Sequence, residues 1–508
     1  MKSIRLQNLR SLKDTGYIKT EGLTIIAGEN SVGKSTILRS LPLIKQSIET
    51  KTTSPFLWYG NYVDFGSFKE SLNRNSEDSR IVFTFEFDLP IVFRRITHRY
   101  DYSIENDESP KYVKIELFVN GKEKSDYINE IKITVIDNHI DILIDNKGKV
   151  IKATINNEDM TEIMKDYVFI NPITGIIPDI YVKRDVNSKF EFTYYGWRYS
   201  DNKFLIKLVN LIKSKVNSKT SGEKIYDIIG HFKIQSKELF ISNILRSGQE
   251  LISWDKFLKS PESKKCIEHM RNLYIGVALN DIFRSISEYL NIFANDIYYI
   301  APIRANANRY YRNQNLSVES VDFQGINLPM LLANLSPANK KEFSMWVNEN
   351  FGFEVITKMS EGHISINIKR DNEVTNIVDC GFGYSQILPI ITQLWLLTKK
   401  RSKRRNLTLI IEQPELHLHP KMQGNLIDLF VKCINLKSTN INIIIETHSE
   451  TIVNRIGYLI YSNKISKDNI NVYLLKKKTN GVIVDQGYYD ENGILENWPI
   501  DFFNAEEI

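Results

Sequence analysis

The amino-acid sequence predicts an α/β fold, on three observations. Short apolar runs that end in polar residues, at 23–27, 407–411 and 440–445, are typical of buried strands. A glycine-rich loop and a helical pattern directly follow the first of these runs. Apolar residues recur at every second position across 80–195, whereas across 203–294 they recur with the period of a helix. We therefore expect an α/β core that carries a β-rich lobe and a helical insertion.

Composition indicates a folded globular chain. The 508 residues are enough for about three domains. A net charge of +5 is small for this length and does not indicate a dedicated nucleic-acid binder. Cys266, Cys380 and Cys433 are too far apart for a metal site, so free thiols in a reducing compartment are expected. The N-terminus does not fit a secretory signal, and no apolar run reaches about 18 residues. We expect a cytoplasmic protein without a membrane partner.

The loop at 28–36 reads GENSVGKST and fits the phosphate-binding pattern G-x-x-x-x-G-K-[ST]. Glycines allow the backbone to turn tightly, so that its N–H groups and the start of the next helix meet phosphate oxygens. Lys34 is expected to contact the β- and γ-phosphates, and the Ser35 hydroxyl to ligate Mg²⁺. The residues expected to hold the nucleotide are Gly28, Asn30, Ser31, Gly33, Lys34, Ser35 and Thr36.

The elements around this loop follow from the periodicity of apolar residues. Residues 3–9 alternate as a half-buried strand, and the helix after the loop extends to about residue 50. The turn-rich segment 60–68 is either a sensor beside the metal or γ-phosphate or an ordinary surface loop. Strands are expected at 81–89, 112–119, 130–136, 140–144 and 189–195. Apolar stripes from Phe204 to Ile212 and from Cys266 to Leu290 predict packed helices, and no heptad array indicates a long coiled coil.

The C-terminal part supplies a second set of polar residues. Residues 379–386 (DCGFGYSQ) open an apolar helix, and a Gly-x-Gly-x-Ser segment at a helix N-terminus offers N–H groups and a hydroxyl to an anion. The strand at 407–412 ends in Glu412, a Walker-B pattern whose carboxylate holds Mg²⁺. The strand at 440–445 leads to Glu446, Thr447 and His448, and an open α/β sheet binds its ligands at such strand ends.

Three further segments have two interpretations each. Residues 298–304 and the arginines after them either contact phosphate or form a solvated basic loop. The run 399–405 (KKRSKRR) either contacts nucleic acid or is a solvated connector. His417 and His419 have the spacing of a metal pair, but no Cys or third ligand is spaced to complete a site.

These motifs, in this order, resemble those of ABC-type ATPase heads, the class found in SMC proteins, DNA-repair ATPases and OLD-family nucleases. The matching segments are 28–36, 381–386, 410–420 and 446–450, supported by 66–68, 301–304 and the tail 498–503. More narrowly, the chain resembles stand-alone bacterial ATPases of anti-phage defence operons, of the Septu type.

The resemblance implies an ABC-type P-loop core built from both ends of the chain, with ATP and Mg²⁺ as cofactors. It divides the chain into three parts. Residues 1–200 would hold the first half of the core with an antiparallel β lobe. Residues 201–298 would form the helical insertion, an arm or oligomer contact, and residues 299–508 the second half of the core.

The resemblance also implies roles for single residues. Gly383 and Ser385 stand where a signature motif contacts the γ-phosphate bound to a partner subunit, and His448 stands where a switch histidine senses it. Residues 416–420 are expected near a dimer interface, so two ATP molecules would lie between the heads of a homodimer or higher homo-oligomer. Glu412 replaces the magnesium aspartate of these ATPases, and Gln413 replaces their catalytic glutamate.

A glutamine at position 413 changes the expected chemistry, because a carboxamide orients water but cannot take its proton. General-base help contributes about 10²–10⁴ in rate, so we expect slow hydrolysis or an ATP-held switch unless Glu415 or Glu446 supplies the carboxylate. About 60 residues follow His448, too few for the Toprim nuclease domain of OLD-family proteins. No nuclease activity is therefore expected in this chain.

The expected function is that of an ATPase in bacterial anti-phage defence that oligomerises around ATP and regulates a separate effector, such as a nuclease. Two alternatives remain open: a DNA-repair or chromosome-type ATPase that acts directly on DNA, and a non-hydrolysing ATP-bound scaffold. The expected catalytic residues are Glu412, Gln413 and His448, and the expected metal ligands are Ser35 and Glu412.

Overall fold

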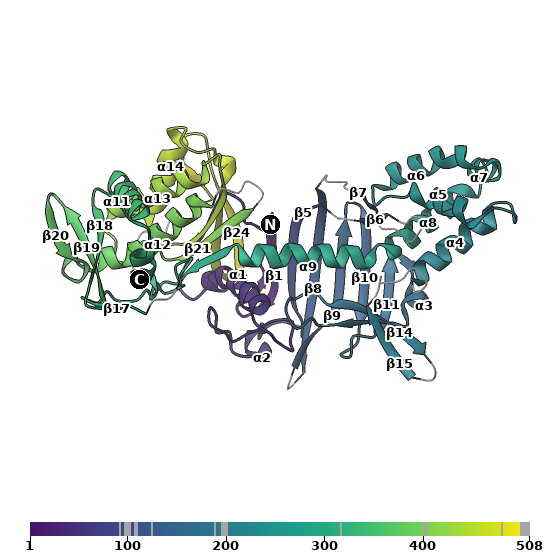
Figure 1. Ribbon diagram of the computed structural model, residues 1–508, viewed down its shortest axis with the longest axis horizontal. Coiled ribbons are helices and arrows are strands. Elements are labelled where there is room, and N and C mark those ends of the chain that lie inside the picture. The colour runs from purple at the N-terminus through teal and green to yellow at the C-terminus, as the bar shows by residue number, and fades with distance from the viewer. Residues whose placement is uncertain are drawn as a thin grey trace.

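The computed structural model describes residues 1–90, 93–95, 103–105, 110–122, 125–186, 189–194, 202–314, 317–400, 405–478 and 481–497. Within these residues, one 16-stranded sheet runs through most of the length of the elongated molecule (Figure 1). Its strands are parallel at one end, where helices cover both faces, and antiparallel further along. The predicted α/β class is confirmed.

The parallel part contains strands from both ends of the chain. Its order is β16 (Ile297–Ile300), β21 (Asn406–Glu412), β22 (Asn440–Glu446), β4 (Leu23–Gly28) and β23 (Ile470–Lys478). Every residue of β4 is buried, because the sheet is covered on both faces. Ile26 packs in the apolar cluster of helix α1 (Lys34–Glu49). Its neighbours Ile25 and Ala27 pack in the cluster of α12 (Phe382–Lys399) and α13 (Pro420–Ile434).

The rest of the sheet is antiparallel, apart from one parallel pairing between its first two strands in the order below. Its strands, in spatial order, are β24 (Gly481–Tyr489), β2 (Leu12–Asp14), β1 (Ser3–Leu9), β5 (Ile81–Leu89), β8 (Lys111–Lys122), β9 (Ser125–Val135), β10 (Asn138–Ile144), β11 (Val150–Ile155) and β12 (Glu158–Asp159). Helix α9 (Leu279–Asn295) crosses the face of this part (Figure 1), where the ring of Tyr289 stacks on Phe87 with 4.2 Å between centroids. Polar and apolar residues alternate along these strands because only one face is packed in this way.

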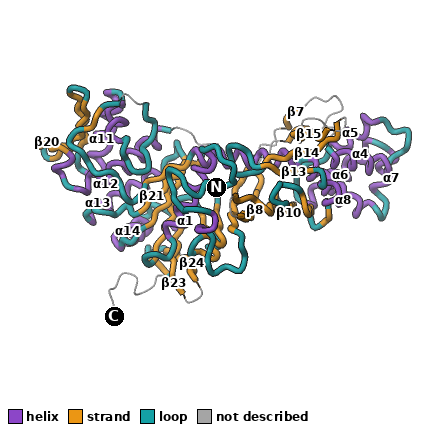
Figure 2. The backbone as a smooth tube through the Cα atoms, turned by 90° about the horizontal axis from the view of Figure 1, so that it is seen from below, coloured by secondary structure: helices purple, strands orange, loops and turns teal. Residues whose placement is uncertain are grey.

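Helices after the β lobe form the end of the molecule farthest from the parallel strands (Figures 1 and 2). They are α4 (Lys203–Lys215), α5 (Gly222–Gly230), α6 (Lys237–Arg246), α7 (Ile252–Leu258) and α8 (Ser263–Val277). The apolar stripe from Cys266 to Leu290 spans two helices, α8 and α9, which meet at Ala278. Helix α9 then leads back to β16 in the parallel part.

Smaller elements complete the described chain. The helices are α2 (Phe68–Ser71), α3 (Thr161–Met164), α10 (Leu328–Asn334), α11 (Pro337–Phe351) and α14 (Glu450–Tyr461). The strands are β3 (Ile18–Lys19), β6 (Phe93–Arg95), β7 (Ser103–Glu105), β13 (Tyr167–Ile170), β14 (Asp179–Val186), β15 (Lys189–Tyr194), β17 (Tyr311–Arg312), β18 (Glu354–Ser360), β19 (His363–Arg370), β20 (Glu373–Asn376) and β25 (Leu495–Glu496). No helix among the described residues is long and apolar enough to cross a bilayer.

The expected strands are present. The strand expected at 130–136 begins five residues earlier, at Ser125, whereas the other ends shift by at most three residues. Strands β11, β13 and β14 were not predicted. Most of the basic run 399–405 and the tail 498–503 lie outside the described residues. The apolar helix that residues 379–386 were expected to open already begins within them, at Phe382. The Gly-x-Gly-x-Ser segment therefore forms its first turn.

Candidate functional site

The loop between β4 and α1 has a backbone that only glycine allows at two positions. Gly28 has φ +153°, and a Cβ there would lie 2.4 Å from the Leu475 carbonyl oxygen of β23. Gly33 has φ +104°, and a Cβ there would lie 2.5 Å from Ser11 Oγ. These close contacts explain both glycines of the motif. Lys34 Nζ lies over the loop and donates a 2.9 Å hydrogen bond to the Gly28 carbonyl.

A cavity of about 1070 Å³ opens at this loop. The predicted residues that line it are Asn30, Ser31, Gly33, Lys34, Ser35, Thr36, Gln413 and His448, and Glu446 joins them. They come together because β4, β22 and β21 are adjacent and parallel, with Glu446 paired with Ile26 on one side and Glu412 on the other. The structure thus brings most of the predicted site residues to one place.

Glu446 lies at the centre of this group. Ser35 Oγ donates a 2.8 Å hydrogen bond to its Oε2 atom. Burial raises the pKa of Glu446 to about 7, and the nearby Glu412 carboxylate adds to the shift, whereas Ser35, Lys34 and Arg39 oppose it. The carboxylate that contacts Ser35, the loop residue expected to ligate Mg²⁺, is therefore Glu446.

Glu412, the predicted Walker-B acid, is engaged elsewhere. Arg39, one turn after Ser35 on α1, donates two hydrogen bonds to its carboxylate, at 2.7 and 2.8 Å. The Tyr299 hydroxyl donates a third, at 2.7 Å. Glu412 is only 1% exposed and does not line the cavity. The pairing with Arg39 is a feature that the sequence analysis missed.

The residues after β21 form a tight polar turn. Gln413 has φ +45°, and its N–H donates a 2.9 Å hydrogen bond to the Glu446 carbonyl. Glu415 Oε1 accepts a 2.8 Å hydrogen bond from the His448 N–H, and burial raises the pKa of Glu415. Burial and the charge of Lys34 lower the pKa of His448, which favours the neutral imidazole. Gln413 and His448 are thus held beside the phosphate-binding loop by backbone hydrogen bonds.

The buried side chain of Arg304 also contacts this turn. Its Nη2 atom donates a 3.0 Å hydrogen bond to the Glu412 carbonyl. It is 3% exposed, and burial lowers its pKa to about 10. Of the later arginines, Arg309 forms a 2.6 Å ion pair with Asp379. In this structure these two arginines contact protein groups.

Gly383 and Ser385 lie apart from the cavity. They occupy the first turn of α12, where Ser385 Oγ donates a 2.8 Å hydrogen bond to the Phe382 carbonyl. Neither residue lines the cavity at the phosphate-binding loop of its own chain. The two histidines considered as a metal pair have other contacts: His419 Nδ1 accepts a hydrogen bond from the Lys421 N–H at the start of α13, and the His417 ring lies 5.9 Å from that of Phe382.

The structure adds cations that the sequence analysis missed. Five from outside the loop and α1 line the cavity: Arg10, Lys13, Arg74, Lys477 and Lys478. They come from the turn between β1 and β2, from β2 itself, from the loop at 72–75 and from the hairpin of β23 and β24. Only the run Lys476–Lys478 was visible as a charge cluster in the sequence. Their common charge favours a ligand with several phosphates.

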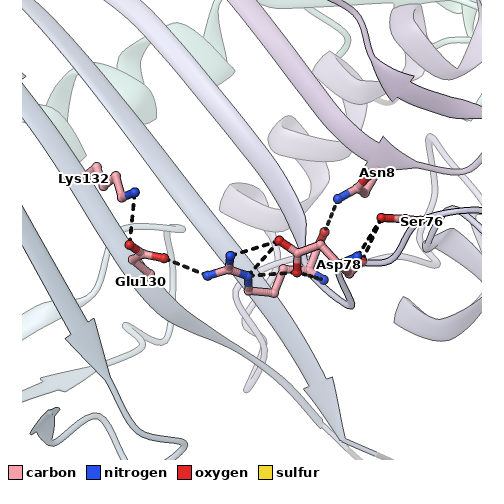
Figure 3. Close-up of polar contacts among 6 residues, drawn as sticks. Asn8, Ser76, Asp78, Glu130 and Lys132 are labelled. Carbon is pink, nitrogen blue, oxygen red and sulfur yellow. Dashed lines mark hydrogen bonds and ion pairs between the residues drawn. The ribbon is translucent and has the colours of Figure 1, made fainter.

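The loop that carries Arg74 is tied to the β lobe by a polar network (Figure 3). Arg80 bridges Asp78 at 2.9 Å and Glu130 of β9 at 2.7 Å. Asn8 Nδ2 donates a 3.0 Å hydrogen bond to the Arg80 carbonyl, and the Asn8 carbonyl accepts one from the Asn73 N–H at 2.9 Å. One wall of the cavity is therefore anchored to two strands of the sheet, β1 and β9.

Comparisons with known proteins give one matching family and several similar solved structures. Among solved structures, similar chains include the Smc head domain with an extended coiled coil, bound to the C-terminal domain of ScpA, from Pyrococcus furiosus (10% identity, 96% of this chain and 95% of that chain, TM-score 0.34). The SMC head domain from Thermotoga maritima is also similar (9% identity, 96% and 98%, TM-score 0.34). No curated protein matches. The family described as the AAA ATPase domain matches residues 1–453. The chain therefore belongs to the AAA ATPase domain family, whose activity is the binding and hydrolysis of ATP.

Proposed function

We propose that this chain is an Mg²⁺-dependent ATPase that hydrolyses ATP slowly, dimerises around the nucleotide and regulates a separate effector, a nuclease in bacterial anti-phage defence. The observation that carries the proposal is the cavity in which the phosphate-binding loop faces Gln413, Glu446 and His448. Hydroxyl and carboxylate oxygens suit Mg²⁺, so the donors present fit this ion.

Slow hydrolysis follows from the groups that would meet the attacking water. Lys34 neutralises phosphate charge, and the Gln413 carboxamide orients water by hydrogen bonds without accepting its proton. The neutral imidazole of His448 offers a second hydrogen-bonding group beside the loop. The bound metal ion supplies charge stabilisation to the phosphates. Unless Glu415 or Glu446 supplies the proton acceptor, the lack of a carboxylate at position 413 accounts for the low turnover that we expect.

Dimerisation is supported by the position of Gly383 and Ser385. Because they do not line the cavity of their own chain, contact with a nucleotide requires a second chain. Large apolar side chains are exposed near the start of α12 and the turn after β16: Phe382 is 61% and Ile303 77% exposed. Exposed apolar side chains near Gly383 and Ser385 suit a face that a second copy covers when ATP is bound.

The test is ATP turnover and molecular mass of the purified protein, with and without ATP. Lys34→Ala is the test variant, and Lys69→Ala, an exposed lysine outside the cavity, is the matched control. We expect slow turnover and an ATP-dependent increase in mass for the wild type and Lys69→Ala, and neither for Lys34→Ala. Turnover that persists in Lys34→Ala would contradict the proposed site. Turnover with no change in mass would contradict the dimer.

The effector is tested in cells. Phage challenge of bacteria that carry the gene with its neighbours should show protection, and Lys34→Ala should remove it. The five additional cations of the cavity favour a second candidate, an ATPase that acts on DNA. Duplex DNA would then stimulate turnover, and the stimulation would fall steeply as salt rises.

A further inference from the structure

We infer that Glu446, and not Glu412, is the carboxylate that faces nucleotide-bound Mg²⁺ in this chain, and that Glu412 is a structural partner of Arg39. The inference rests on the proposed ATP site and assigns its metal ligand. It reverses the assignment that the sequence motif predicts. The two carboxylates are paired at the ends of neighbouring strands, so either one is close to the phosphate-binding loop.

Glu412 has its hydrogen-bonding capacity filled by the protein. Its Oε1 atom accepts from Arg39 Nε and from the Tyr299 hydroxyl, both at 2.7 Å, and its Oε2 atom accepts from Arg39 Nη2 at 2.8 Å. A bidentate guanidinium both neutralises a carboxylate and fixes its plane. Turning Glu412 towards a metal would break this pair in a nearly fully buried place, where a lone charge is costly.

Glu446 has the opposite situation. Its carboxylate contacts the hydroxyl of Ser35, the loop residue that ligates Mg²⁺ in this motif. The two oxygens are 2.8 Å apart. Neighbouring ligands of an octahedral Mg²⁺ are separated by about 3.0 Å, because each lies about 2.1 Å from the ion. Ser35 and Glu446 therefore have the spacing of two adjacent oxygen ligands without any movement of the backbone.

The charge balance supports the same assignment. Arg39 compensates Glu412, whereas Glu446 is 4% exposed and forms no ion pair with a Lys or Arg among the described residues. A buried carboxylate without a paired cation is stabilised by a metal ion. The site thus has one carboxylate that is already neutralised and one whose charge a divalent cation would compensate.

The experiment measures metal affinity and not turnover. Mn²⁺, which is visible by electron paramagnetic resonance, replaces Mg²⁺, and the protein is saturated with a non-hydrolysable ATP analogue. The variants are Glu446→Gln, Glu415→Gln as the matched control that removes another buried carboxylate near Lys34, and the double variant Arg39→Met/Glu412→Gln. Nucleotide affinity without metal is measured in parallel with a fluorescent ATP analogue, and thermal melting checks each fold.

We expect Glu446→Gln to weaken Mn²⁺ binding by more than about tenfold, and Glu415→Gln and the double variant by less than about threefold. Ser35→Ala is the second variant: its loss should resemble that of Glu446→Gln and should not add to it, since both remove ligands of one ion. A tenfold loss in the double variant with none in Glu446→Gln would overturn the assignment. An equal loss in Glu446→Gln and Glu415→Gln would also overturn it, because the effect would then be one of charge alone.

The failure of this assignment and that of the proposed function are distinguishable. If the wild-type protein binds the ATP analogue and Mn²⁺ but the variants follow the wrong order, only the assignment of Glu446 fails. If the wild-type protein binds no nucleotide, the ATPase function fails, and the metal site fails with it.

Discussion

Replacement of Arg39 by methionine tests whether Glu412 depends on its partner inside the protein. The change removes two hydrogen bonds of 2.7 and 2.8 Å and leaves a carboxylate that is 1% exposed with the Tyr299 hydroxyl alone. Removing one partner of a buried ion pair costs about 3–5 kcal/mol. Because the Arg39 side chain is itself 34% exposed, the lower end applies, and we expect unfolding free energy to fall by about 3 kcal/mol.

The assay is equilibrium urea unfolding without nucleotide, followed by tryptophan fluorescence. Arg39→Met/Glu412→Gln is the control, because it removes both charges and leaves neither unpaired. Neutral replacements of buried pairs are often tolerated, so the double variant should cost about 1 kcal/mol or less. The reasoning is refuted if Arg39→Met costs less than about 1 kcal/mol, or if the double variant is as unstable as the single one.

Three other variants and one pH profile test separate parts of the site. Gly28→Ala should weaken ATP binding by more than about tenfold, since its Cβ meets the backbone of Leu475, and calorimetry measures this. Gln413→Glu should raise turnover by about tenfold or more by supplying a proton acceptor; unchanged turnover would show that the missing base is not limiting. Burial raises the pKa of Glu446 to about 7, so the folded state binds its proton more tightly than the unfolded state, and this stabilisation is lost as pH rises from about 4.5 through 7. Metal-free Glu446→Gln should therefore be about 3 kcal/mol more stable than wild type at pH 8 and equal to it at pH 4.5, by thermal melting. Arg80→Ala should release the loop at 72–75 and lower stability by about 1–2 kcal/mol, with weaker ATP binding; unchanged ATP affinity would show that the loop does not contact the nucleotide.

The parts of the fold and site that could be predicted are those encoded locally. The phosphate-binding loop is one segment whose flanking strand and helix are adjacent in the chain, and the ends of β21 and β22 follow from buried apolar runs. The partner of Glu412 could not be predicted, because Arg39 lies 373 positions away and meets it only when α1 packs on the sheet. The two glutamates have similar sequence contexts, each at the end of an apolar strand. Only the packed structure distinguishes the one that faces Ser35 from the one that faces Arg39.

The short strands β11 and β13 escaped prediction for a different reason. The sequence of β11, VIKATI, does not alternate cleanly, and β13 is a four-residue run that periodicity alone does not separate from a loop. The cations of the cavity also come from segments that are remote in sequence. Lys477 and Arg10 become neighbours of one cavity because β24 pairs with β2 across the join between the two ends of the chain.

Helix α9 makes the distal helices and the nucleotide site mechanically continuous. Its 17 residues form a strut about 25 Å long at about 1.5 Å per residue. The strut ends at Asp296, which is clamped to Arg405 at 2.7 Å, and runs on into β16, whose Tyr299 holds Glu412. A protein that binds and tilts the distal helices would therefore also move α9 and β16, the strand beside the Walker-B turn. By thermodynamic reciprocity, nucleotide occupancy would bias the affinity of that remote surface to the same extent.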